Sequence, residues 1–341
     1  MKRCIPLIQF VRLVASMLLA AVCSCCSLDE EIVSQWGMDV SCPHLVSLSP
    51  ADETCVKADF TQPVRVVASS LRTDIEDGPD LPVSPADTAL STAVSFLLPA
   101  APGPGKKALL SATVEDARGN RLSFAVPFVG WNSRVPRLAV NEIRCVYSKP
   151  RVEFVELLVL EDGNLGGVAI ENPGNAASPV WTFPSVEVSR GDFVVYHLRS
   201  IEEGLVDEVS PGLVSAGTDA RADAVDFWDD QTKAPLKKTG GILVRERVGG
   251  KILDAAFWAE DGKDSWPNPG LEAAAAEAVS QGSWGPDSGI GSAVPSMGTT
   301  ATRTLCRDRF SGGVEDTDSA ADWRVCATGK SSAGAENFHW Q

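Results

Sequence analysis

The chain has 341 residues, of which 44% are hydrophobic, and a formal net charge of −15. This hydrophobic content is sufficient for two or three packed domains and excludes wholesale disorder. A chain this acidic repels phosphate backbones and anionic membrane surfaces. We therefore expect no nucleic-acid partner, and we expect any attachment to a membrane to come from a covalent lipid.

The amino-terminal residues 1–24 have the pattern of a secretory signal. Lys2 and Arg3 precede an apolar run that is too short and wrongly flanked for a transmembrane helix. The run ends in Val22-Cys23-Ser24-Cys25-Cys26, where Cys25 follows a small residue and has a branched apolar residue three positions before it. This arrangement resembles a bacterial lipobox and predicts lipidation of Cys25.

The resemblance implies a lipoprotein held in the bacterial cell envelope, in the inner or the outer membrane and either periplasmic or surface-exposed. Stable anchoring needs more than one acyl chain. Residues 25–40 are expected to form a tether between the lipid and the fold. An ordinary cleaved signal and a retained anchor are the alternatives.

Export would place the remaining five cysteines in a compartment that permits disulfides. Cys42 and Cys55 are close in sequence, as are Cys306 and Cys326, and these four are candidates for disulfides. Cys145 has no obvious partner. Connectivity cannot be deduced from the sequence, so free thiols are an open alternative for all five. None of the five lies in a CxxC pair, so zinc or redox chemistry has no support.

Residues 41–132 show an all-β pattern. The stretches 109–115 and 121–128 predict a hairpin joined through Asp116-Ala117-Arg118-Gly119-Asn120. Short strands with regular turn signals predict a β-sandwich. Together with Ser49-Pro50-Ala51-Asp52 and Phe60-Thr61-Gln62-Pro63-Val64, this pattern resembles bacterial Ig-like modules of cell-surface proteins.

A second domain, predicted over 138–341, opens after a short linker that contains Pro136. Asn141-Glu142-Ile143 lies in its first expected strand, and Glu156-Leu157 lies in its second. Here the chain resembles the lamin tail domain, an Ig-like β-sandwich whose first strand carries Asn-Glu-Ile and whose second carries a Glu-Leu step.

Further motifs follow in the order of that family. They are Trp181-Thr182-Phe183-Pro184, a Gly191 turn into a strand, a hairpin around Gly249-Gly250 whose second strand holds Asp254, the closing Asp322-Trp323, and Gly334-Ala335-Glu336-Asn337. The resemblance implies structural roles for nine residues: Asn141, Glu142, Glu156, Phe183, Pro184, Gly191, Asp254, Asp322 and Trp323. It implies an Ig-like sandwich that is not known for catalysis of its own.

Two insertions, at about 200–238 and 261–296, depart from the family pattern. The second carries the one convincing helix, with Pro269 at its start and Gly282 at its end. We expect it at the edge of the sandwich, with Trp266 and Trp284 nearby. The predicted fold is all-β, with two tandem Ig-like β-sandwich domains, the second with a short helical insertion.

Three glutamates and a cluster of acids are candidates for chemistry. Glu142, Glu153 and Glu156 on adjacent strands suggest acid–base catalysis, but charges that fix strand register or bind backbone are the favoured interpretation. We therefore predict no catalytic residue. The stretch with Glu315, Asp316, Asp318 and Asp322 suits calcium, but lacks the full EF-hand pattern. A loop that locks the last strand through Asp322 and Trp323 is favoured, and no metal is predicted.

The remaining candidates are weaker. Arg190-Gly191-Asp192 is an integrin-recognition tripeptide, but it falls where turn chemistry already explains it. His44, His197 and His339 are scattered, and no nucleophile elbow, phosphate loop or dinucleotide fingerprint occurs, so no cofactor is predicted. Several tryptophans and acidic residues cluster around the insertions. They suit either glycan binding or packing of the insertions, and packing is favoured. The set is Trp228, Trp258, Trp266 and Trp284 with Asp226, Asp229, Asp230 and Glu260.

These observations favour a non-enzymatic, lipid-anchored envelope protein. In this hypothesis an Ig-like spacer presents a lamin-tail-like sandwich to a protein or glycan partner. The alternatives are a carboxylate-dependent hydrolase, or an accessory module of one, that acts on a polysaccharide or phosphoester, and a surface adhesin.

Overall fold

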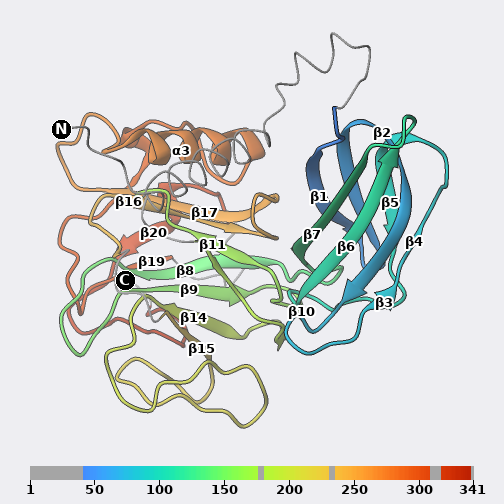
Figure 1. The fold of residues 1–341 in the computed structure, drawn as a ribbon. Helices are drawn as coiled ribbons and strands as arrows, with labels where there is room; N and C mark the ends of the chain where they lie inside the picture. Colours follow the sequence, from blue (N-terminus) through green and yellow to red (C-terminus); the bar gives the residue numbers. More distant parts are fainter. Residues whose placement is uncertain (1–40, 176–179, 230–234, 308–315, 339–341) are drawn as a thin grey trace, which may run out of the picture.

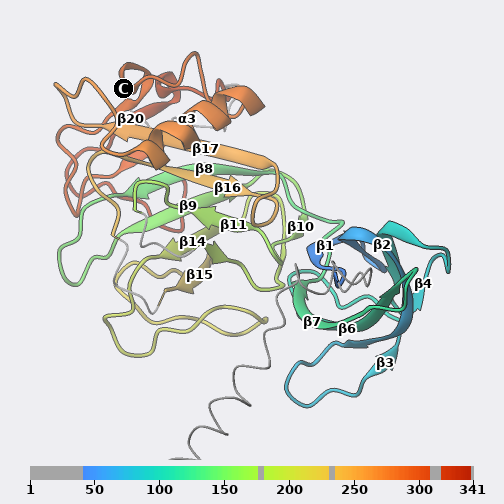
Figure 2. The same ribbon diagram turned by 45° about the horizontal axis from the view of Figure 1, so that its top comes forward.

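The computed structural model describes residues 41–175, 180–229, 235–307 and 316–338 (Figure 1). Strands form most of its regular structure, and α3 (Pro269–Gln281) is the single α-helix within these ranges. The prediction of an all-β chain with one helical insertion is therefore confirmed. Figures 1 and 2 show two bodies, which follow one another along the chain.

The first body is one seven-stranded sheet that wraps around its own core. Its strands are β1 (Leu45–Asp52), β2 (Cys55–Arg72), β3 (Leu81–Pro82), β4 (Ser84–Pro85), β5 (Ser91–Leu97), β6 (Lys107–Asp116) and β7 (Arg121–Val129). An irregularity between Asp59 and Val64 divides β2, so its first part pairs with β1 and β5 and its second part with β6. The core includes Val56, Phe96 and Leu110.

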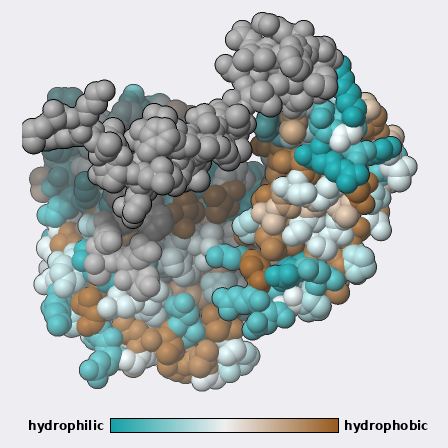
Figure 3. Space-filling model, in the orientation of Figure 1, coloured by the Kyte–Doolittle hydropathy of each residue, from teal (hydrophilic) through white to brown (hydrophobic). Residues whose placement is uncertain are grey.

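The predicted hairpin of the first body is confirmed as β6 and β7. Asp116 organises its turn, because Oδ1 accepts hydrogen bonds from the backbone nitrogens of Arg118 and Asn120 and Oδ2 accepts one from the Asn120 side chain. Hydrophobic and hydrophilic residues are interspersed over the visible face of this body (Figure 3). Such interspersion follows from the two-residue period of a strand.

The two bodies touch where the chain passes from one to the other. Asn132 donates hydrogen bonds from Nδ2 to the carbonyl oxygens of Asn164 and Gly166, at 2.7 and 3.0 Å. The backbone of Gly105 lies so close to Gly167 that a Cβ at Gly105 would be 2.5 Å from the Gly167 nitrogen. Any residue other than glycine would therefore separate the bodies at this point.

The second body contains two larger sheets and a short ribbon. The six-stranded sheet has the order β15 (Val225–Trp228), β14 (Phe193–His197), β9 (Phe154–Val159), β8 (Leu138–Arg144), β19 (Leu305–Arg307) and β20 (Trp323–Val325). The five-stranded sheet has the order β12 (Trp181–Thr182), β11 (Ala169–Glu171), β16 (Gly240–Arg245), β17 (Ile252–Ala259) and β18 (Val294–Pro295). β10 (Gly163–Asn164) pairs with β13 (Glu187–Val188).

The two larger sheets enclose the main core, which includes Ile143, Val155, Leu157 and Val244. The opposite face of the six-stranded sheet is also buried, although it is polar. Strand register aligns Cys306, Glu142, Glu156, Val195 and Asp226 in one row across this face. The strands are apolar on one face and mostly polar on the other, so the polar face needs a cover from elsewhere in the chain.

The helix has the ends that the sequence predicts. Asn268 caps its start by accepting a hydrogen bond from the Leu271 nitrogen at 2.9 Å, and Gly282 ends it in the left-handed conformation at φ 74°. Its expected place at the edge of the sandwich was wrong. It covers the outer face of β16 and β17, because Gly241 leaves room for Leu271 and because Arg245 of β16 pairs with Glu277 of the helix.

Gly282 offers a test of this helix end. We expect Gly282→Ala to lower the free energy of unfolding by about 1 kcal/mol, because an L-residue is strained in the left-handed region. No heavy atom lies within 4 Å of the added Cβ, so backbone strain is the whole effect. Urea denaturation followed by tryptophan fluorescence measures the loss. Gly291→Ala is the control: it also meets no neighbour, its φ is not positive, and it should stay within about 0.5 kcal/mol of the wild type. Equal losses would contradict the prediction.

The predicted membrane attachment concerns residues that the structure does not describe. Residues 1–24, Cys25 and the tether 25–40 lie outside the described ranges. Among the residues that are described, no helix has the length and apolar character needed to cross a membrane.

Candidate functional site

Glu142 and Glu156 lie side by side on the polar face of the six-stranded sheet, and we call them the carboxylate pair. They are register partners on β8 and β9, and both are 0% exposed. Asn141 sits at a bulge between Val140 and Glu142, and its Nδ2 donates to Glu156 Oε1 at 2.6 Å. Glu153, the third sequence candidate, lies apart from the pair and forms a bidentate ion pair with Arg199.

The segment 331–337, which we call the closing segment, covers this pair. Ser332 donates from its hydroxyl to Glu142 Oε2 at 2.6 Å, and its backbone nitrogen reaches the same carboxylate at 3.0 Å. The Ser331 hydroxyl adds a hydrogen bond to Glu142 Oε1, and the Gly334 nitrogen donates to Glu156 Oε2 at 2.6 Å. The carboxylates therefore bind backbone and hydroxyl groups of the chain itself.

Burial changes the proton affinity of the pair. Removal from water raises the pKa of Glu142, although the hydrogen bonds from Ser332, Thr304 and Ser331 oppose this. Burial raises the pKa of Glu156 well above its usual range, and the neighbouring charge of Glu142 raises it further. Because Glu142 receives more hydrogen bonds than Glu156, the pair favours a proton on Glu156 in the folded state.

This proton predicts a pH dependence. The folded state retains a proton that an ordinary glutamate releases near its usual pKa of 4.5. Rising pH therefore favours the unfolded chain, and the contribution of Glu156 to stability is lost between pH 4.5 and its raised folded pKa. We expect Glu156→Gln to flatten the decline in free energy of unfolding above pH 4.5, measured by urea denaturation from pH 4 to 8.

The control for this experiment is Glu187→Gln. Hydrogen bonds from Asn164 and Arg134 lower the pKa of Glu187, so Glu187 is charged in both states above pH 4.5. Its replacement should change the stability by a constant amount across that range and leave the slope as in the wild type. A Glu156→Gln slope equal to that of the wild type would refute the proton assigned to Glu156.

The same polar face buries one of the three histidines that are scattered along the sequence, and the sequence did not predict its partners. His197 is 0% exposed, its Nε2 lies 2.6 Å from Asp226 Oδ1, and its ring stacks on Trp228 at 3.7 Å. The Asp226 nitrogen donates to Glu208, which also accepts from the Ser215 nitrogen. These contacts fix the first insertion onto β14, and the parallel pairing of β14 with β15 creates them.

A buried arginine also fixes this insertion. Arg144 of β8 is fully buried, and its guanidinium contacts Asp219, the Ser331 hydroxyl and the Val152 carbonyl oxygen. Arg151 reaches Asp219 at 3.0 Å. Arg144 therefore joins the first insertion and the closing segment to one strand.

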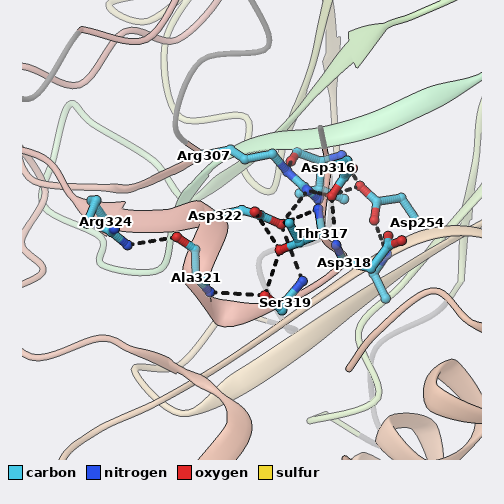
Figure 4. Close-up of polar contacts among 11 residues, drawn as sticks. Asp254, Arg307, Asp316, Thr317, Asp318, Ser319, Ala321, Asp322 and Arg324 are labelled. Carbon is cyan, nitrogen blue, oxygen red and sulfur yellow. Dashed lines mark hydrogen bonds and ion pairs between the residues drawn. The ribbon is translucent and has the colours of Figure 1, made fainter. Parts of the chain in front are cut away.

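The acidic stretch near the last strand surrounds Arg307 (Figure 4). The Arg307 guanidinium is 1% exposed and forms ion pairs with Asp254 at 2.9 Å, with Asp316, and with Asp322 at 3.5 Å. Carboxylate oxygens of Asp254, Asp316 and Asp318 lie within 4.8 Å of one another. Such oxygens suit a hard cation such as calcium, but here a guanidinium already lies among them. Glu315 lies outside the described residues.

Two further features of this cluster bear on its stability. Burial raises the pKa of Asp254 to about 7, although the positive charge of Arg307 opposes the shift. Asp322 caps the turn before β20 by accepting hydrogen bonds from the backbone nitrogens of Thr317 and Ser319. Trp323 is buried, and its ring faces Arg307 with the guanidinium carbon 5.1 Å from the ring centroid.

The other sequence candidates occupy structural positions. Gly191 has φ 97° in the turn before β14, and Asp192 closes that turn by accepting a hydrogen bond from the Ser189 nitrogen. The aspartate of the Arg-Gly-Asp tripeptide is thus engaged. Phe183 is buried against Trp181, at 4.5 Å between ring centroids, and Pro184 is half-buried. His44 is exposed, and His339 lies outside the described residues.

The tryptophans of the insertions are mostly packed inside. Trp228, Trp258 and Trp284 are buried, and Trp266 and Trp284 both contact Phe257. Asp229 accepts a hydrogen bond from the Tyr196 hydroxyl at 2.6 Å, and Asp226 binds His197. Glu260 hydrogen-bonds through its backbone nitrogen to Thr239, and Asp230 lies outside the described residues.

A surface groove of about 520 Å³ lies between the first insertion and the ribbon of β10 and β13; we call it the insertion groove. Val209, Leu213 and Val214 line it and are themselves exposed. Figure 3 shows hydrophobic residues on the surface over this insertion. Glu187 and Glu208 supply the charged part of the lining.

Cys42 and Cys55, two of the four candidates for disulfides, lie too far apart to pair with each other. Asp52 faces Cys55 at the turn of the β1–β2 hairpin, whereas Cys42 precedes the far end of β1. At about 3.3 Å per residue the two cysteines are roughly 20 Å apart or more, while a disulfide needs Cα atoms within about 7 Å. The five cysteines of the described chain, Cys42, Cys55, Cys145, Cys306 and Cys326, are all free thiols in this structure.

Comparison with known proteins places the second body in a family. The family TP_1001_2nd, described as a protein second domain, matches residues 136–325. The chain belongs to this family. The match starts two residues before β8 and ends at the last residue of β20, so it covers the two larger sheets and leaves out the closing segment.

A relative from Treponema pallidum (strain Nichols), an uncharacterized protein, is 38% identical over 191 residues, which are 54% of this chain and 49% of the relative. The chain thus spans about half the length of that relative. Among solved structures, the N-terminal part of the S-layer protein SbsC covers 48% of this chain and 42% of its own at 14% identity and a TM-score of 0.24. SbsC domains 1–6 cover 60% and 39% at 11% identity and a TM-score of 0.22. TM-scores this low support no conclusion about the fold or the role of this chain.

Proposed function

We propose that this member of the TP_1001_2nd family is a lipid-anchored protein of the bacterial cell envelope that acts as a non-enzymatic binding module. The signal-like residues 1–24 and the lipobox around Cys25 support the anchor. The first body acts as an Ig-like spacer. The second presents a lamin-tail-like, Ig-like sandwich, a proposal supported by its two packed sheets and by the order of its motifs, to a protein or glycan partner.

The hydrogen bonds from the closing segment to the carboxylate pair are the observation that favours binding over catalysis. A hydrolase that used Glu142 and Glu156 would have to bring a substrate within hydrogen-bond reach of both. That position holds the closing segment, whose Ser332 and Gly334 nitrogens bind the two carboxylates. The insertion groove, with its exposed Val209, Leu213 and Val214, is accessible to a partner.

The binding-module proposal and the hydrolase alternative predict opposite results in a hydrolysis assay. Under the binding-module proposal, purified protein should release no p-nitrophenol from p-nitrophenyl glycosides or from bis-p-nitrophenyl phosphate. Glu142→Gln and Glu156→Gln are near-isosteric and keep hydrogen-bonding capacity, so they separate catalysis from folding. Turnover by the wild type that both variants lose, with unchanged circular dichroism, would overturn the binding-module proposal.

The anchor has its own experiment. Cells that express the protein should incorporate labelled palmitate into it, and Cys25→Ala should abolish the label while Cys23→Ala keeps it. Labelling that survives in Cys25→Ala would refute Cys25 as the anchor. Digestion of intact cells with proteinase K, with lysed cells as the control, then distinguishes a periplasmic from a surface-exposed protein.

A further inference from the structure

Two thiols meet at the open end of the β19–β20 pair, away from the loop that joins the two strands. Thr304 Oγ1 lies 3.3 Å from Cys306 Sγ and 3.2 Å from Cys326 Sγ, and the two thiols hydrogen-bond one another. Cys326 is held by the backbone on both sides, because its nitrogen donates to the Thr304 carbonyl oxygen and its sulfur accepts from the Thr304 nitrogen. Both side chains are 0% exposed.

No other pair within the described ranges has this geometry. Cys42 and Cys55 lie at opposite ends of β1. Cys145 is buried elsewhere and donates to Thr299 Oγ1 at 3.6 Å. Cys306 lies in β19 and faces Arg324 of the antiparallel β20, and Cys326 directly follows β20, so the two cysteines are diagonal neighbours on one face.

We propose that Cys306 and Cys326 form a disulfide when the protein meets a small-molecule disulfide such as oxidised glutathione. The Cys326 thiolate attacks one sulfur of the donor, breaks its S–S bond and releases one thiolate. Cys306 then loses its proton to solvent, and its sulfur attacks the Cys326 sulfur in the mixed disulfide, which releases the second thiolate. Two protein thiols are thereby oxidised by two electrons, and the donor disulfide is reduced to two thiols.

The surroundings favour Cys326 as the first attacking group. The hydrogen bond that it receives from Cys306 lowers the pKa of Cys326 to about 6, and the same bond together with burial raises the pKa of Cys306. A thiolate is the nucleophile in exchange, so Cys326 reacts before Cys306. Because both sulfurs are buried, exchange proceeds during folding or through a local opening of β20.

The consequence is local reinforcement of the last strand. The bond would close a loop that carries Arg307 at one end and Asp322 and Trp323 at the other. It would also hold β20 against β19 directly beside Glu142, which faces Cys306 in the register. The disulfide therefore secures the strand that precedes the closing segment.

Mass spectrometry tests the pairing. The full chain, purified in detergent and reduced, is unfolded, refolded in a buffer of reduced and oxidised glutathione, alkylated with N-ethylmaleimide and digested. Trypsin cleaves after Arg303, Arg307, Arg324 and Lys330, so Cys306 and Cys326 fall on different peptides. We expect peptides 304–307 and 325–330 to be joined by one disulfide, with Cys42, Cys55 and Cys145 alkylated. Alkylation of both Cys306 and Cys326 at every glutathione ratio, or linkage of either to another cysteine, would overturn the proposal.

Thermal unfolding supplies a second measurement. Dithiothreitol should lower the Tm of the refolded wild type by about 5–10 °C, because a loop of this length is opened. Cys326→Ser should show no response to the reductant, and the control Cys145→Ser should respond as the wild type does. A reductant response that persists in Cys326→Ser, or is absent from the wild type, would contradict the assigned bond.

Discussion

Arg307→Ala is expected to lower the free energy of unfolding by about 3–5 kcal/mol, the range for breaking a buried ion pair by removal of one partner. The guanidinium is 1% exposed and pairs with Asp254, which is 3% exposed. Its Nε also donates to the Val140 carbonyl oxygen at 2.8 Å. Without it, Asp254, Asp316 and Asp322 would repel one another around an unfilled centre, and the turn before β20 would lose its support.

Urea denaturation followed by tryptophan fluorescence measures this loss. Arg324→Ala is the matched control, because Arg324 is exposed and, among the described residues, donates only to the carbonyl oxygens of Ala321 and Trp323. This variant should change stability by less than about 1 kcal/mol. Adding Asp254→Asn to Arg307→Ala should recover part of the loss, since it removes the buried charge left unpaired. An Arg307→Ala protein as stable as Arg324→Ala would show that the cluster does not depend on its guanidinium.

Glu142→Ala is expected to cost about 3 kcal/mol and to release the closing segment. The substitution removes the buried acceptor of three donors in the closing segment. These donors are the Ser331 hydroxyl, the Ser332 hydroxyl and the Ser332 nitrogen. An unsatisfied buried donor costs about 1–3 kcal/mol. Lys330, which is exposed and directly precedes the segment, should become a fast site for trypsin.

Limited proteolysis with mass detection of cleavage after Lys330 reports the release, and urea denaturation reports the stability. Glu142→Gln keeps one acceptor oxygen for these donors, so it should lose only about 1 kcal/mol and stay resistant at Lys330. If Glu142→Ala resists trypsin as the wild type does, the closing segment is held by other contacts and the role assigned to Glu142 is wrong.

Local sequence signals predicted the local structure well. The Asp116 turn and the residues around it predicted the β6–β7 hairpin, and Pro269 and Gly282 predicted both ends of α3. These signals work because a turn or a helix end depends on a few neighbouring residues. The place of the helix was missed, because it depends on the space above Gly241, which is set by β16 and by Leu271 some 30 residues later.

The contacts of the polar face could not be predicted in the same way. His197 meets Asp226 only because β14 and β15 pair in parallel across the first insertion. Ser332 looks like an ordinary loop residue in sequence, and nothing near it signals a buried glutamate 190 positions earlier. The sequence pointed to the right glutamates, but the groups that neutralise them come from a segment without a distinctive pattern.

That separation along the chain imposes an order on biogenesis. The Ser332 and Gly334 nitrogens reach Glu142 and Glu156 across 190 and 178 positions. Strands β8 and β9 are synthesised and threaded through any export machinery long before the residues that neutralise their buried acids. The first body can mature while the rest of the chain is still being made. The second body cannot complete its folding until nearly all of its residues have emerged, and until then the two glutamates of its six-stranded sheet stay uncovered.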